Sequence, residues 1–97
     1  MDANTVFANN ARDFEKNMHE FIATEVQTSF TFAGIANTTT DEIRKRRDAA
    51  KARVAYDSAL RFIAEAREKF PKHPIASSSL DGMEKLKQLL ERLGERF

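Results

Sequence analysis

The fold is decided by residues 39–71, TTDEIRKRRDAAKARVAYDSALRFIAEAREKFP. In the second half of this stretch, apolar side chains recur every three or four residues: Ala52, Tyr56, Ala59, Ile63, Ala66 and Phe70. This spacing places them along one face of an α-helix. Thr39 followed by Glu42 is a capping box that predicts the start of the helix, and Pro71 predicts its end. We therefore expect one long helix over about residues 40–70.

The segment before it carries a second helical stripe. Phenylalanine recurs every seven residues at first, and the stripe then drifts: Phe7, Ala11, Phe14, Met18, Phe21, Ile22, Val26, Phe30 and Ala33. This period predicts a helix over about residues 5–36. Between Val26 and Phe32 apolar and polar residues also alternate, which is typical of a strand, but no other stretch offers a partner strand. We therefore predict a helix throughout and expect Gly34 to mark fraying or a close approach.

A third helix is predicted after Pro71 and Pro74. Its apolar positions again step by three and four residues: Met83, Leu86, Leu90, Leu93 and Phe97. Ser78 or Asp81 can cap it, which places it at about residues 80–95. With residues 37–40 as a turn, the sequence predicts an all-α fold. It is a single domain over residues 1–97, with a long antiparallel hairpin of residues 5–36 and 40–70 and a shorter third helix.

Composition agrees with one small helical domain and excludes several functions. The 97 residues are 41% hydrophobic and 32% charged, with three Gly and two Pro, which is too apolar for a disordered chain. A net charge of +1 provides no overall field for nucleic acid or a membrane. The chain has no Cys, which excludes disulfides and thiolate chemistry. Because no signal peptide or apolar span is recognisable, we expect a soluble cytoplasmic protein with no membrane partner.

A mismatch in helix length predicts an interface. The third helix is about half as long as the hairpin and starts from its far end, so we expect it to cover residues near 5–22 and 54–70. The half of the hairpin near the turn then has only two helices to bury its apolar side chains, Val26, Phe30, Phe32 and Ile35. We predict that these residues contact a second copy of the chain, giving a dimer, or another protein.

The first half of the second helix is strongly basic. Six cations lie within ten residues: Arg44, Lys45, Arg46, Arg47, Lys51 and Arg53. They point around most of the helix, so they form a collar rather than a stripe, and no aromatic residue alternates with them as a base-stacking platform requires. A solvated surface, partly neutralised by pairs such as Glu25 with Lys51, is the preferred interpretation. Binding of nucleic-acid phosphates or an acidic protein is the alternative.

No catalytic, cofactor or metal site is predicted. The two histidines are His19 and His73, and Glu15 lies one turn before His19, but two ligands do not make a metal site. A phosphotransfer role for His19 is conceivable but lacks any supporting motif. The chain has no Gly-rich phosphate loop or metalloprotease motif, and the serines of residues 77–79 suit a loop and a helix cap. We therefore expect a protein that is not an enzyme and that acts through interactions.

One segment is similar to a known family. Residues 55–71, AYDSALRFIAEAREKFP, resemble the second helix of a tetratricopeptide repeat, with Tyr56, Ala59, Ile63, Ala66 and Pro71 on the characteristic positions. The resemblance implies a repeat-like packing of helices and a role in protein binding. It stops upstream, because residues 48–53 lack the turn that a repeat unit requires, and no second copy follows at a period of about 34 residues.

Overall fold

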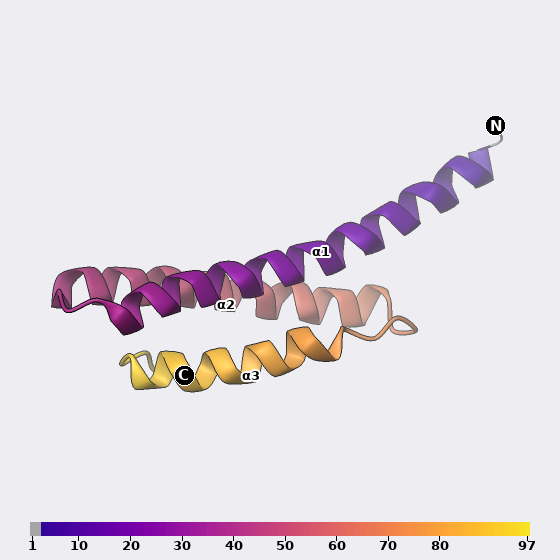
Figure 1. Cartoon of the computed structure of the whole chain (residues 1–97). Helices are drawn as coiled ribbons and strands as arrows, with labels where there is room; N and C mark the ends of the chain where they lie inside the picture. The colour runs from indigo at the N-terminus through magenta and orange to yellow at the C-terminus, as the bar shows by residue number, and fades with distance from the viewer. Residues whose placement is uncertain (1–2) are drawn as a thin grey trace.

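Three helices and a short C-terminal tail make up the described part of the chain (Figure 1). The structure, a computed structural model, describes residues 3–97, and side chains from residue 14 onward. Its helices are α1 (Ala3–Thr38), α2 (Glu42–Lys69) and α3 (Ser77–Arg92). α1 and α2 run antiparallel as a long hairpin, and the Cα atoms extend over 59 × 21 × 18 Å. The predicted all-α fold, a helical hairpin with a shorter third helix, is confirmed; the region from Val26 to Phe32 is helical.

Small side chains bring α1 and α2 into close contact. The residues of the α1–α2 interface with no exposed surface are Ser29, Ala33 and Ala36 on α1 and Ala52, Ala59 and Ala66 on α2. The hydroxyl of Ser29 donates a hydrogen bond of 2.8 Å to the carbonyl oxygen of Ala52, across the two helices. Tyr56 and Ile63, between the small residues of α2, are also buried, so the apolar seam predicted in α2 lies in the core.

The turn between α1 and α2 lies later in the chain than predicted. α1 continues to Thr38, whose hydroxyl donates to the carbonyl oxygens of Gly34 and Ile35. Asp41, rather than Thr39, caps α2: its Oδ1 accepts from the backbone N–H groups of Ile43 at 2.9 Å and Arg44 at 3.2 Å. A carboxylate at this position also suits the positive end of the helix dipole.

The later turn changes which residues face each other in the hairpin. The ammonium of Lys51 lies 5.4 Å from the centre of the Phe32 ring, so the predicted pairing of Lys51 with Glu25 is wrong. Gly34 lies inside the helix and marks neither fraying nor a close approach, since a Cβ placed there would have no atom within 4 Å.

The ends of α2 and α3 are set by backbone chemistry. α2 ends with Phe70 as its C-cap, directly before Pro71, as predicted. α3 begins at Ser77 after Ala76, which makes no side-chain capping bond, so neither Ser78 nor Asp81 caps it. At its other end Gly94 has a φ of 98°, and the N–H of Glu95 bonds to the carbonyl of Leu90 at 2.9 Å. This is a Schellman ending, in which the positive φ favours glycine.

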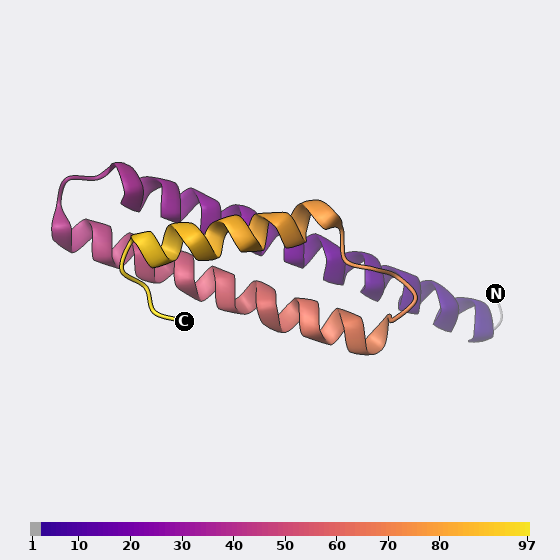
Figure 2. The same ribbon diagram turned by 90° about the horizontal axis from the view of Figure 1, so that it is seen from below.

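α3 covers the half of the hairpin near the turn, which is opposite to the prediction (Figure 2). The backbone of Gly82 lies against α1, since a Cβ there would be 3.1 Å from Cγ1 of Val26 and 3.4 Å from Cε2 of Phe30. At the other end of α3, the ring of Phe97 packs edge-on against Tyr56, with centroids 5.2 Å apart. The prediction that α3 covers residues near 5–22 and 54–70 is wrong, because residues 70–76 run back along the hairpin before α3 begins.

Candidate functional site

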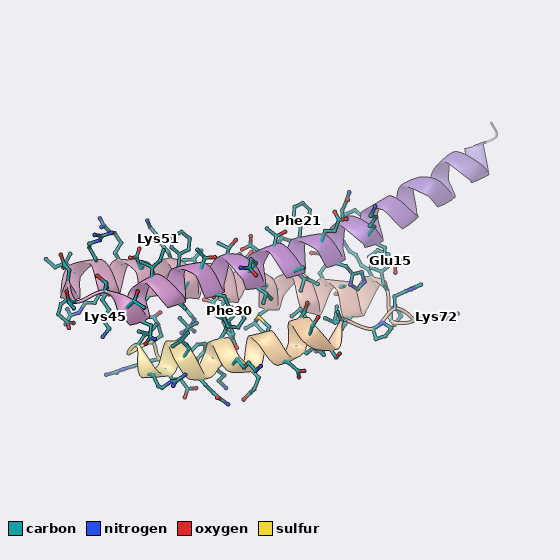
Figure 3. All side chains as sticks on the ribbon, in the orientation of Figure 1. Glu15, Phe21, Phe30, Lys45, Lys51 and Lys72 are labelled. Atoms are coloured by element: carbon teal, nitrogen blue, oxygen red, sulfur yellow. The ribbon has the colours of Figure 1, made fainter. Side chains whose placement is uncertain are left out.

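The four residues of the predicted interface lie in three different environments. Val26 is buried, and Phe30 is partly buried between α1 and α3 (Figure 3). Phe32 is partly buried under Lys51, and Ile35 is 40% exposed. Two of the four are therefore covered by α3 within the single chain. Binding of a partner by this set stays a prediction, and only Phe32 and Ile35 remain on an uncovered side of the hairpin.

The most exposed aromatic surface lies on the side of the hairpin away from α3. Phe21 is 54% exposed and points away from α3 in Figure 3, while its ring stacks on Phe62 with centroids 5.7 Å apart. Phe14 is 47% exposed and its ring lies 6.0 Å from that of Phe70. Phe14, Phe21 and Phe32 are separated by two and then three helical turns, so they share one side of α1. We call this surface the outer face: Phe14, Phe21, Phe32 and Ile35 of α1, with Phe62 of α2.

A hollow lies in the outer face between α1 and α2. It has a volume of about 240 Å³ and is lined by Phe14, Asn17, Met18, Phe21, Phe62 and Glu65. Glu65 forms an ion pair with Lys69, whose ammonium also lies 5.1 Å from the centre of the Phe14 ring. An apolar centre with a charged rim is the usual anatomy of a protein–protein interface.

The first turns of α1 project beyond the rest of the molecule. Phe14 already lies opposite Phe70, the last residue before the linker, so the preceding turns of α1 extend past the end of α2 (Figure 1). Phe7, predicted to lie on the apolar stripe of α1, is outside the side chains that the structure describes. The outer face therefore ends where α1 continues beyond α2 without a neighbouring helix.

The basic stretch of α2 is divided among several environments. Arg53 forms an ion pair with Asp57 at 3.0 Å, and its guanidinium lies 3.8 Å from the centre of the Phe97 ring. Lys45 and Arg46 instead face α3 across a cleft of about 560 Å³. Among the side chains of residues 14–97, Arg53 is the one cation of the six that forms an ion pair. The collar is thus neutralised only in part.

The histidines and the buried tyrosine make other contacts. Nδ1 of His73, in the linker, lies 3.0 Å from Oε1 of Glu15, so Glu15 contacts His73 rather than acting with His19. Burial raises the pKa of Tyr56 above its ordinary value, although the nearby Arg53 opposes this shift. In the part of the chain that the structure describes, no three potential metal ligands lie together, and no helix has the length and apolar character needed to cross a bilayer.

Comparison with protein-family models, with curated proteins and with solved structures finds no match to this chain. The similarity of residues 55–71 to a tetratricopeptide repeat stays a prediction. α2 passes without interruption through residues 48–55, where a repeat unit would turn.

Sequence reasoning included Phe32 and Ile35 of the outer face in its predicted interface, but it missed Phe14, Phe21 and the cleft. The seven-residue spacing of Phe14 and Phe21 was a usable signal for the outer face, but the prediction placed both residues in the part of the hairpin that the third helix was expected to cover. The cleft had no local signal, because its walls come from residues far apart in the sequence.

Proposed function

We propose that this is a non-enzymatic helical protein that self-associates as a dimer through the outer face. The observation that carries the proposal is the exposure of Phe14 and Phe21, which share one side of α1. Figure 3 shows Phe21 pointing away from α3. Each phenylalanine buries on the order of 150–250 Å² when fully covered, so covering this surface in water is favourable. Soluble monomers rarely expose contiguous apolar surfaces larger than a few hundred Å², and larger ones mark interaction sites.

A second copy of the chain is the partner that the shape of the molecule favours. The outer face contains the hollow beside Phe21 and Phe62, and it ends where the first turns of α1 project beyond α2. In an antiparallel two-fold arrangement, the first turns of α1 in each copy lie over the hollow of the other. One surface is then used twice, as a two-fold interface requires. With a net charge of +1, two copies repel each other only weakly.

Sedimentation velocity at low micromolar concentration tests the proposal. We expect the wild type to sediment as a dimer and Phe21→Glu to sediment as a monomer with unchanged helical circular dichroism. The matched control is Leu60→Glu, because Leu60 is 44% exposed and lies two residues from Phe62, on another side of α2. Phe30 is unsuitable for this test because it packs between α1 and α3. A monomeric wild type, or equal loss of the dimer in both variants, would contradict the proposal.

Nucleic-acid binding through Arg44, Lys45, Arg46, Arg47, Lys51 and Arg53 is the alternative. It is favoured by the small number of ion pairs that these cations form among the described side chains. Contacts to several phosphates would make the affinity fall steeply with rising salt. Against this alternative, Lys51 and Arg53 already contact aromatic rings of the same chain, Phe32 and Phe97.

A further inference from the structure

We infer that the cleft between the start of α2 and the end of α3 binds a small phosphate-bearing molecule that also carries hydroxyl groups. We call it the α2–α3 cleft; it is lined by Glu42, Lys45, Arg46, Ala49, Arg92, Leu93, Gly94 and Glu95. Its volume of about 560 Å³ lies within the range of small-molecule sites, roughly 300–1,000 Å³. The site rests on the packing of α3 against the hairpin, and it is independent of the proposed dimer.

Local backbone structure shapes the cleft. Ala49 is buried and small, so its side chain leaves space between α2 and the end of α3. On the opposite wall α3 ends at Arg92, and the positive φ of Gly94 turns the chain away from the helix axis. The N–H groups of Leu93, Gly94 and Glu95 bond back to carbonyls of the last turn of α3. These hydrogen bonds fix the backbone that carries Arg92 and Glu95 on this side of the cleft.

Three cations from two helices line the cleft. Lys45 is partly buried, while Arg46 and Arg92 are exposed. Among the described side chains, none of the three has a carboxylate oxygen within 4 Å. Guanidinium groups bind phosphate through two parallel N–H bonds, and an ammonium adds a point charge. The two arginines and the lysine therefore suit one phosphate group.

Two carboxylates line the same cleft and define the rest of the ligand. Glu42 and Glu95 leave the five ionised side chains with a net charge of only +1, so a bare inorganic anion is repelled as well as attracted. Hydroxyl groups of the ligand would donate hydrogen bonds to these carboxylates, because ionised carboxylates accept hydrogen bonds and donate none. The carboxylates would then favour binding. A phosphorylated sugar or a nucleotide carries both kinds of group.

Isothermal titration calorimetry of the full chain at low salt provides the test, with ribose 5-phosphate and inorganic phosphate as separate probes. We expect ribose 5-phosphate to bind, and Arg46→Gln and Arg92→Gln each to weaken it about tenfold or more. Arg61→Gln is the matched control, since it removes the same charge from an exposed position of α2 outside the cleft. Glu95→Gln should weaken ribose 5-phosphate but strengthen inorganic phosphate, a change of sign that a merely structural role would not produce.

Several outcomes would overturn the inference. One is the absence of binding by ribose 5-phosphate; another is equal weakening by Arg61→Gln, which would indicate only general attraction between charges. Binding of a single-stranded oligonucleotide without binding of ribose 5-phosphate would also refute it and would support the nucleic-acid alternative. Phe21→Glu should keep its affinity for ribose 5-phosphate even if it no longer dimerises, so failure of the dimer and failure of the cleft are distinguishable.

Discussion

Replacing Leu86 by Ala tests how α3 is held against the hairpin. The side chain of Leu86 has no exposed surface and belongs to the same apolar cluster as Val26 and Met83. Truncation removes three carbon atoms, which at about 0.8 kcal/mol per methylene costs roughly 2.4 kcal/mol of transfer free energy. The cavity left behind raises the expected loss in free energy of unfolding to about 3–5 kcal/mol.

Leu80→Ala is the matched control for this measurement. Leu80 lies on the same helix and is 36% exposed, so we expect its truncation to cost only about 1.5 kcal/mol, the transfer free energy of its buried part without a closed cavity. Both substitutions change helix propensity equally, and the difference between them therefore reports burial. Urea unfolding followed by far-ultraviolet circular dichroism provides both values. For a domain of this size, Leu86→Ala should also lower the Tm by at least about 12 °C.

Two results would refute this reasoning. Equal losses at Leu86 and Leu80 would mean that α3 does not bury the face that the structure assigns to it. A first transition confined to α3, followed by unfolding of the hairpin, would mean that the two parts are not one cooperative unit. We expect one transition with an unchanged m-value.

The pH dependence of Tyr56 and the packing at Ser29 give two further predictions. Tyr56 is the single tyrosine in a chain without tryptophan, so tyrosinate absorbance reports it alone, and its raised pKa predicts ionisation above the ordinary value of 10.0. Because the folded-state pKa is the higher one, this contribution to stability is complete below pH 10 and is lost as pH rises towards the folded-state value. Tyr56→Phe should remove that part of the alkaline loss; an unshifted titration would contradict the burial argument. Ser29→Ala should cost about 0.5–1.5 kcal/mol in urea unfolding through the lost hydrogen bond to Ala52, and Ser29→Leu should cost more through overpacking. A Ser29→Leu protein as stable as the wild type would show that α1 and α2 are not in close contact there.

The three helices and their approximate bounds could be predicted because their signals are local. Apolar spacing of three and four residues marks the buried side of α2, and Pro71 ends that helix wherever the segment lies. The caps are also local, but several candidates competed. Asp41 was preferred over Thr39 because α1 continued through Thr38, and only the folded turn shows this.

The position of α3 could not be predicted because it depends on the conformation of residues 70–76. A tight turn would have placed α3 beside the far half of the hairpin, whereas the observed path places Gly82 against Val26. The exposure of Phe14 and Phe21 also depends on tertiary packing. Small residues such as Ala59 and Ala66 let α1 and α2 approach closely, and the large rings are displaced to the edge of that contact.

The sequence by itself determined that this chain is helical, where its helices lie and which seam of α2 enters the core, because spacing and helix breakers act within a few residues. Tertiary structure decided which surfaces remain for function. It removed Val26 and Phe30 from the predicted interface by placing α3 over them, and it brought Arg92 beside Lys45 and Arg46. These outcomes depend on contacts between residues more than forty positions apart, and no local pattern encodes the path of the linker that creates them.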